Sequence, residues 1–224
     1  MNSNKIYPSL ISTDLLNLEH AIQMLEPHCA GFHLDVMDFH FVPNLTWGPD
    51  FINAIRKATK KQLWIDLLVD LPQPYLERLQ LQKDDIISVH YESEYDNDIF
   101  RMIRKKGCKA SLALDPKTPI EVIVPFLDVI DHVLLMSVPP GFSGQEFVYE
   151  SVDKAKKLYM LREKLISEPQ HAGFLIGMDG GLNETTLPLV VEYVDTFAIA
   201  AGIFGAKDSI EMLRKLEQIG EEIK

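Results

Sequence analysis

Short apolar runs, rich in β-branched residues, alternate along the chain with longer segments whose apolar residues recur every three or four positions. The short runs predict strands, and the longer segments predict amphipathic helices. The predicted strands are residues 6–11, 31–36, 62–68, 85–90, 109–114, 131–137, 173–179 and 196–200. The predicted helices are residues 14–25, 50–59, 74–81, 96–106, 119–126, 149–165, 184–192 and 206–219.

Strands that alternate with helices predict a parallel sheet, because each right-handed crossover needs a helix to return the chain. Eight such units in about 220 residues predict a single (β/α)8 TIM barrel domain over residues 1–224. An open, doubly wound parallel sheet is the alternative topology. In a parallel barrel, the active site lies at the carboxyl ends of the strands.

The chain is acidic, with 22 Lys and Arg against 33 Asp and Glu and a formal net charge of −11. An acidic surface repels polyanions, which argues against a nucleic-acid-binding protein. Two cysteines, Cys29 and Cys108, are too few for a disulfide framework and suit a reducing compartment. The first residues lack the pattern of a signal peptide, and no apolar run reaches the length of about 18 residues that a membrane span needs. We therefore expect a cytoplasmic protein with no membrane partner.

Polar residues end several of the predicted strands. His33 and Asp35 are two positions apart, so the alternation of a strand places both side chains on the same face. Asp66 and Asp179 end two further strands. One imidazole and several carboxylates at one rim suit a divalent metal ion. An isolated His-x-Asp pair, by contrast, is more often a buried pair joined by a hydrogen bond.

Pairs of glycines follow two of these strands. Gly141 and Gly144 lie in the stretch 134–147, after the sixth predicted strand, and permit a cradle of backbone amides for an anion. Gly180 and Gly181 directly follow Asp179 and let a ligand approach the main chain closely. Ordinary turn chemistry explains either pair taken alone, but their position at the same rim favours a ligand site.

Several irregular sequence blocks resemble the signature blocks of the ribulose-phosphate 3-epimerase family. They are PSLIS at 8–12, HLDVMDFHFVPN at 33–44, TWGP at 46–49, MSVPPGFSGQ at 136–145 and MDGG at 178–181. Their order and spacing agree as well, so the resemblance spans almost the whole chain. It implies a ribulose-phosphate-binding barrel, a divalent metal ion at the strand ends, a homo-oligomer, and interconversion of D-ribulose 5-phosphate with D-xylulose 5-phosphate.

The resemblance also implies roles for the matching positions. Asp35 and Asp179 take the two acid/base positions, and both bind the metal together with His33. Ser9 matches a substrate contact, and Met37 and Met136 match the methionines that pack against the reacting carbons. The remaining expected substrate and phosphate contacts are Gly141, Phe142, Ser143, Gly144, Gly180, Gly181, Ala200 and Ala201.

The chain departs from the family pattern in three places, one of which is a dipeptide. Asp66 stands where the family usually has a metal-binding His, which gives a harder and more anionic ligand set. Among Mn, Fe(II), Zn, Co and Mg, such a set shifts the preference from zinc toward manganese, magnesium or iron(II). Ala200 and Ala201 replace a Gly-Ser dipeptide that binds phosphate, and Phe39 replaces a glycine and adds bulk near the mouth.

The residue types suit epimerisation next to a ketone. This reaction removes a proton from one face of a carbon and returns one to the other face, which two carboxylates can do through an ene-diolate. We therefore predict a metal-dependent ketose-phosphate 3-epimerase whose partner is a small phosphorylated sugar. Phe39, Asp66 and Ala201 motivate an alternative, which acts on a different ketose phosphate such as a hexulose 6-phosphate. A non-catalytic phosphosugar-binding paralogue is the third hypothesis.

Overall fold

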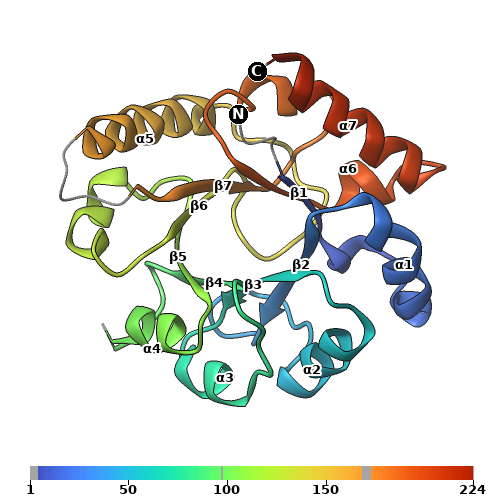
Figure 1. Cartoon of the computed structure of the whole chain (residues 1–224), viewed down its shortest axis with the longest axis horizontal. Helices are drawn as coiled ribbons and strands as arrows, with labels where there is room; N and C mark the ends of the chain where they lie inside the picture. The colour runs from blue at the N-terminus through green and yellow to red at the C-terminus, as the bar shows by residue number, and fades with distance from the viewer. Residues whose placement is uncertain (1–4, 97, 168–172, 224) are drawn as a thin grey trace.

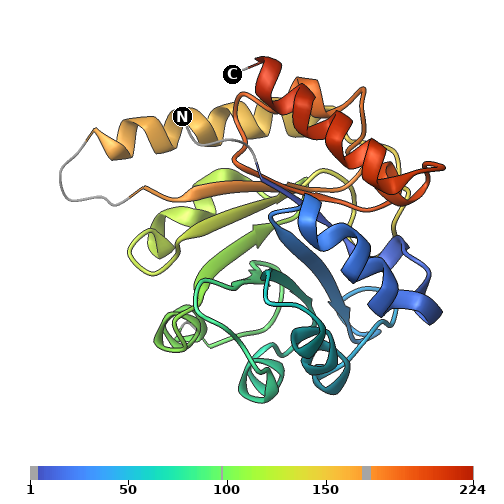
Figure 2. The ribbon, with the colours of Figure 1, turned by 45° about the vertical axis from the view of Figure 1, so that its right-hand side comes forward.

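Eight parallel strands form one sheet, in the order β1-β8-β7-β6-β5-β4-β3-β2. The structure is a computed structural model that describes residues 5–96, 98–167 and 173–223. The helices surround the strands on the outside, as Figures 1 and 2 show. The predicted (β/α)8 barrel is confirmed, and the open doubly wound sheet is excluded because β1 closes the ring between β8 and β2.

The elements have the following bounds. The strands are β1 Lys5–Pro8, β2 Gly31–Met37, β3 Gln62–Leu68, β4 Ile86–His90, β5 Lys109–Leu114, β6 His132–Met136, β7 Leu175–Asp179 and β8 Thr196–Ile199. The α-helices are α1 Leu18–Leu25, α2 Pro49–Ala58, α3 Gln73–Arg78, α4 Ile99–Lys105, α5 Glu150–Ile166, α6 Ala201–Phe204 and α7 Ser209–Ile223. The 3-10 helices are η1 Leu10–Ser12, η2 Leu15–Asn17, η3 Glu26–His28, η4 Ile120–Phe126 and η5 Leu187–Leu189.

The strands are buried on both faces, which explains why they appear in the sequence as nearly continuous apolar runs. Every residue of β2, β4, β6 and β8 is buried. The larger core cluster packs between the sheet and the helices, and a smaller one around Trp64 fills the barrel interior. A chain of hydrogen bonds satisfies the polar atoms of this interior, from Trp64 through Ser88, Ser111 and His132 to Thr196.

The ring closes between β1 and β2 with few hydrogen bonds. The main-chain N–H of Ala30 donates to the carbonyl of Ile6 at 3.2 Å, and a single bridge joins Ser9 to His33. Every other neighbouring pair of strands has at least three residues in register. We call this contact between β1 and β2 the seam.

The structure corrects several predicted elements. The expected helix at 119–126 is the 3-10 helix η4, in which Pro125 has no N–H to donate. The expected helix at 184–192 contains only the three-residue η5, which begins before Pro188. The first strand ends at Pro8 and not at residue 11, because the chain turns into η1. Ala200 lies outside β8 and caps the short helix α6.

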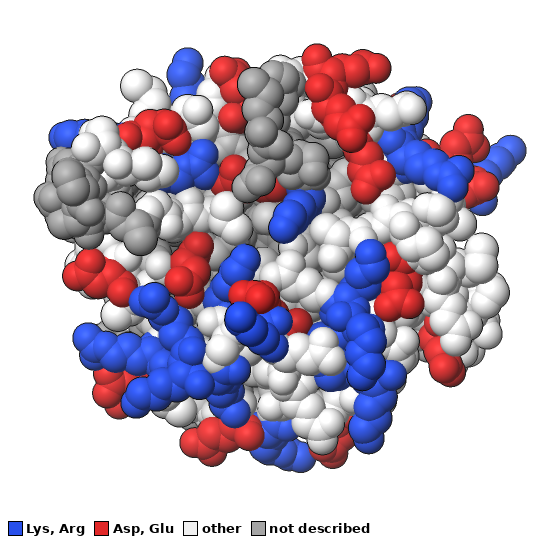
Figure 3. All heavy atoms as spheres, viewed as in Figure 1, with Lys and Arg blue, Asp and Glu red and all other residues white. Residues whose placement is uncertain are grey.

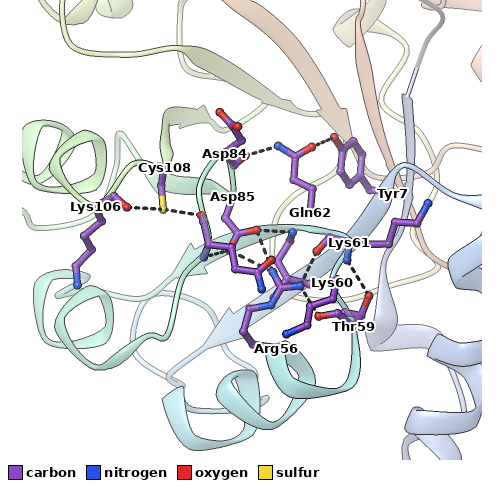
Figure 4. A network of polar contacts seen from close by, with 12 residues as sticks. Tyr7, Arg56, Thr59, Lys60, Lys61, Gln62, Asp84, Asp85, Lys106 and Cys108 are labelled. Carbon is purple, nitrogen blue, oxygen red and sulfur yellow. Dashed lines mark hydrogen bonds and ion pairs between the residues drawn. The ribbon is translucent and has the colours of Figure 1, made fainter.

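A buried ion pair holds the amino-terminal end of the barrel together, and Figure 4 shows the polar network around it. Asp85, which precedes β4, accepts from Arg56 Nη1 at 3.1 Å and from the main-chain N–H groups of Leu63 and Gln82 at 2.8 and 2.7 Å. The other guanidinium nitrogen, Nη2, donates to two main-chain carbonyls after α2, each at 2.6 Å. Most polar atoms of this pair are therefore satisfied.

The net charge of −11 is not spread evenly over the surface. On the face that Figure 3 shows, Lys and Arg side chains gather over α4 and beside α2, with Asp and Glu between them. Within the described residues, no helix combines the length and the apolar character that crossing a membrane requires.

Candidate active site

A cavity of about 620 Å³ opens at the carboxyl ends of the strands. All but two of the predicted site residues line it. These residues are Ser9, Asp35, Met37, Met136, Gly141, Phe142, Ser143, Gly144, Asp179, Gly180, Gly181, Ala200 and Ala201. The two others, His33 and Asp66, are fully buried and contact the cavity through the carboxylates that line it.

Strand register brings the four charged residues together. His33 and Asp35 lie two positions apart on β2, and Asp35 lies level with Asp66 on β3. Asp179 is the last residue of β7. The structure thus unites residues that are up to 146 positions apart in the sequence (179 − 33).

These four residues form a cluster that could hold a metal ion. One ligand atom of each of His33, Asp35, Asp66 and Asp179 lies within 4.8 Å of the others. His33 Nδ1 is 3.4 Å from Asp35 Oδ2, and among the described residues neither ring nitrogen of His33 has a hydrogen-bond partner. Asp66 Oδ1 is likewise buried and, although it lies 3.2 Å from His90 Nε2, has no hydrogen-bond partner among the described residues. Buried polar atoms without partners are costly, and a cation shared among them removes that cost, so the residues fit a divalent ion.

Backbone geometry shapes the other side of the cavity. Gly180 and Gly181 have φ angles of 114° and 62°, which glycine adopts readily. A Cβ on Gly181 would lie 2.7 Å from the main-chain nitrogen of Phe147. Thr186, which the sequence reasoning missed, donates its hydroxyl to the carbonyl of Gly181 at 2.9 Å and lines the cavity. The polar run of residues 183–186 after the paired glycines is the signal that could have revealed it.

Comparison with known proteins identifies the family. Residues 5–204 match the model of the ribulose-phosphate 3 epimerase family. The chain belongs to this family. It is 36% identical over 207 residues to "Ribulose-phosphate 3-epimerase" of Bacillus subtilis (strain 168), which covers 91% of this chain and 94% of that protein. It is 37% identical over 220 residues to the protein of that name from Chlamydia muridarum, covering 97% of this chain and 95% of the other. The prediction of an isomerase of this family is confirmed.

Solved structures of lower identity share the fold. KGPDC from Streptococcus mutans has a TM-score of 0.68 at 14% identity and covers 99% of both chains. The 3-hexulose-6-phosphate synthase of Salmonella typhimurium has a TM-score of 0.67 at 15% identity, over 98% of this chain and all of the other. At this level of identity, the similarity shows that this chain shares the barrel fold of these proteins and shows nothing about its substrate.

The two carboxylates that the family resemblance assigns to acid/base roles have pKa values shifted in opposite directions. Burial alone would raise the pKa of Asp35, but His33 and the Ser9 hydroxyl, which donates to Oδ2 at 2.6 Å, lower it below its ordinary value. Burial raises the pKa of Asp179 to about 7, and the attraction of His33 offsets only part of that rise. The surroundings therefore favour the ionised form of Asp35 and the protonated form of Asp179, each relative to an ordinary aspartate.

The imidazole of the cluster favours its charged form. Burial would lower the pKa of His33, but Asp35 and Asp179 raise it to about 9. A second histidine, His90 at the end of β4, lies with Nε2 3.2 Å from the Asp66 carboxylate. His90 was not among the predicted site residues, although it ends the fourth predicted strand as the other polar residues end theirs.

Phe39 does not narrow the cavity. Its side chain is 66% exposed, and the residue is not among those described as lining the cavity. Its φ angle is 65°, in the left-handed region where a glycine would be unstrained. Apolar contact is provided instead by Met37 and Leu68, which lie level with each other on β2 and β3, and by Met136.

Proposed function

We propose that the chain is a metal-dependent ketose-phosphate 3-epimerase that interconverts D-ribulose 5-phosphate and D-xylulose 5-phosphate. One observation carries the proposal: Asp35 and Asp179 line the same cavity, and their pKa values are shifted in opposite directions. The names of the relatives supply the substrate. The division of roles between a carboxylate base and a carboxylic acid comes from this chain's own residues.

Asp35 and Asp179 would act on opposite faces of the substrate carbon C3. The ionised Asp35 removes the proton next to the ketone, which leaves an ene-diolate, and the protonated Asp179 returns a proton to the other face. Their oxygens lie within 4.8 Å of each other, so both reach a single carbon. In the reverse direction the two roles exchange.

The surrounding side chains prepare this step. Ser9 fixes the orientation of Asp35 through its 2.6 Å hydrogen bond. Met37 and Met136 are nearly fully buried and present apolar surface, which gives the ene-diolate no competing proton donor. The main-chain amides at Gly180–Gly181 and Ala200–Ala201, with the 141–144 loop, would hold the phosphate, so that C3 is positioned between the two carboxyls.

His33, Asp35, Asp66 and Asp179 would hold a divalent ion. When bound, such an ion supplies positive charge next to the substrate oxygens, where proton removal builds up negative charge. Three carboxylates and one imidazole form a hard ligand set, so we expect the preference to shift from zinc toward manganese, iron(II) or magnesium. Competition titrations of the metal-free protein with Mn and Zn test this preference.

Isotope exchange tests the proposed function. In deuterated water, D-ribulose 5-phosphate incubated with the metal-loaded protein should acquire deuterium at C3, which nuclear magnetic resonance detects. Asp35→Asn and Asp179→Asn should each slow the conversion of D-ribulose 5-phosphate to D-xylulose 5-phosphate by about a thousandfold, a loss typical for an acid or base in proton transfer. The matched control is Asp153→Asn, an exposed carboxylate in the first turn of α5, which should leave conversion and exchange unchanged. Conversion that persists in Asp179→Asn would remove this residue from its role.

A panel of ketose phosphates tests the substrate. Phe39 is exposed and lies outside the described cavity lining, so it no longer supports a substrate other than ribulose 5-phosphate. A higher kcat/KM for a hexulose 6-phosphate than for ribulose 5-phosphate would show that the hexulose phosphate is the substrate. Tight binding of a ketose phosphate without deuterium exchange would indicate a non-catalytic paralogue. The predicted homo-oligomer is tested separately, by sedimentation of the purified chain.

A further inference from the structure

A second group of metal-ligating side chains lies beside the candidate active site. His90 ends β4, Glu92 follows two residues later, and Asp115 comes directly after β5. One ligand atom of each lies within 4.8 Å of the others. The proposed proton transfer uses none of these three residues, and they sit at the same rim of the barrel because parallel strands end there together.

The geometry of His90 points to a positive charge at this place. The residue is fully buried, and Nε2 lies 3.2 Å from the Asp66 carboxylate. Burial would lower the pKa of His90, but Asp66 and Asp115 raise it to about 10, so in metal-free protein both ring nitrogens carry a proton. With Nε2–H donating to Asp66, a bound ion would displace the proton of Nδ1. The Nδ1 atom is buried and has no hydrogen-bond partner among the described residues. It faces Asp115 Oδ1 at 3.6 Å and Glu92 Oε2 at 3.9 Å, both too long for a hydrogen bond.

The same distances suit a cation between the three atoms. Two ligand atoms that are each about 2.1 Å from an ion lie roughly 3.4 Å apart in a tetrahedral site, close to the spacing found here. Glu92 is already oriented, because Oε1 accepts the main-chain N–H of Asp115 at 3.0 Å and the Thr118 hydroxyl, so that Oε2 faces His90. Asp115 Oδ1 is a further buried atom without a partner among the described residues.

The group is accessible from solvent but is not neutralised by direct contact with a lysine ammonium. The side chains of Glu92 and Asp115 are 24% and 32% exposed, so an ion can enter from the rim. Lys154 on α5 lies nearby, but its Nζ donates to the main-chain carbonyls of Asp115 and Pro116 at 2.5 and 3.5 Å. Its charge weakens the local negative potential without filling the space between the imidazole and the two carboxylates.

We propose that His90, Glu92 and Asp115 bind a second divalent cation, through His90 Nδ1 and one oxygen of each carboxylate. One imidazole with two carboxylates suits Mn(II) or Zn(II). The ion would fix the tautomer of His90, so that Nε2–H always donates to Asp66. His90 is then a positioning residue for Asp66, in the way that outer partners orient the ligands of metal sites.

Metal counting and crystallography on the full chain test the proposal. The protein is stripped with a chelator, dialysed against saturating Mn(II), and analysed for manganese per chain and for anomalous diffraction peaks. We expect two ions per chain, with one peak between His90 Nδ1 and the carboxylates of Glu92 and Asp115. The variant Glu92→Gln/Asp115→Asn should retain one ion, at the His33 cluster. One ion per wild-type chain, with no peak beside His90 Nδ1, would overturn the proposal.

A charge variant provides a readout that does not depend on folding of the double variant. Lys154→Met removes a positive charge beside the second site and should tighten binding of the second ion at least about threefold, as measured by Mn(II) titration. An unchanged second-site affinity would count against the assignment. Deuterium exchange into substrate with only one ion bound would show that the proposed epimerase stands while the second site fails.

Discussion

Charged groups are buried at both ends of the barrel, but the two ends differ in how many hydrogen-bond partners these groups have. At the amino-terminal end, Asp85 faces Arg56 and two main-chain N–H groups, so its carboxylate is well supplied with donors. At the carboxyl end, three carboxylates share one imidazole, and ring nitrogens of His33 and an oxygen of Asp66 have no partner among the described residues. In the first arrangement the chain's own donors supply the buried carboxylate, whereas the second gains partners only from an added ligand.

The difference separates the residues that maintain the fold from those available for chemistry. A paired and hydrogen-bonded charge gains nothing from a ligand, whereas an unpaired buried group gains the full value of any partner that arrives. Barrel enzymes place their active sites at the carboxyl ends of the strands and their stabilising contacts at the other end. Among the described residues, both ring nitrogens of His33 and one oxygen of Asp66 lack a hydrogen-bond partner at the carboxyl end, whereas of the Arg56–Asp85 pair only Arg56 Nε lacks one.

The largest expected effect comes from Asp179. We expect Asp179→Asn to slow the conversion of D-ribulose 5-phosphate to D-xylulose 5-phosphate about a thousandfold, which corresponds to about 4 kcal/mol in the barrier. In metal-free protein, the same change should leave the free energy of unfolding unchanged or raise it, because it removes one of three clustered carboxylates. Urea unfolding of the metal-free variant and wild type measures this. A large loss of stability would mean that the cluster contributes to the fold.

The opposite pattern is expected at the other end. Arg56→Met leaves Asp85 as a buried charge without its guanidinium and should cost about 3–5 kcal/mol of unfolding free energy. The control is Arg101→Met, which breaks an exposed pair with Asp98 and should cost less than about 1 kcal/mol. Exchange activity per folded molecule should be unchanged in both variants. Similar losses of unfolding free energy in the two variants would contradict the larger cost expected for breaking the buried pair.

The pH dependence of metal binding distinguishes the cluster from a surface site. In metal-free protein, His33 has a pKa of about 9 and Asp179 of about 7. His33 must release its proton to bind a metal through a ring nitrogen, and a proton on Asp179 makes the site less anionic, so affinity should rise with pH from 6 to 9, by up to about tenfold per unit. Calorimetric titration in two buffers of different ionisation enthalpy measures the protons released. Binding at pH 7 without proton release would contradict the ligand role of His33.

The smallest expected effect concerns backbone strain at the functional end. Phe39 adopts a φ of 65° with its side chain mostly exposed, so Phe39→Gly should stabilise the protein by about 1 kcal/mol. The matched control is Leu45→Gly, which is 67% exposed and is not among the described residues with positive φ. It should destabilise by roughly 0.5–1 kcal/mol, because glycine costs more entropy. Thermal unfolding separates the two signs.

The sequence predicted most of the barrel because buried parallel strands leave a simple pattern. The third strand was predicted at 62–68 and observed there, and the second was predicted one residue short of Met37. The sequence wrongly predicted α-helices where η4 and η5 lie, because the spacing of apolar residues over a short segment does not distinguish a 3-10 helix from an α-helix. Prolines at 125 and 188 were the overlooked signal.

The candidate site was predictable where chemistry coincides with strand ends. Asp35 and Asp179 were found because each stands at or near the end of an apolar run, and the structure places both at one cavity. The grouping of His90 with Glu92 and Asp115 depends on the register between β4 and β5, where His90 lies level with Ala113. That register is a tertiary property. The unpartnered atoms could not be counted before the neighbours of each side chain were known.

The seam between β1 and β2 has a consequence for how quickly the protein exchanges its ion. An ion held by His33 and Asp35 on β2 and by Asp179 on β7 would link these two strands across the seam and across β1 and β8, which lie between them. Because few backbone hydrogen bonds close the ring there, local opening of the barrel and escape of the ion involve the same movement. Conditions that speed the exchange of β1 amide protons with solvent should then also speed removal of the ion by a chelator.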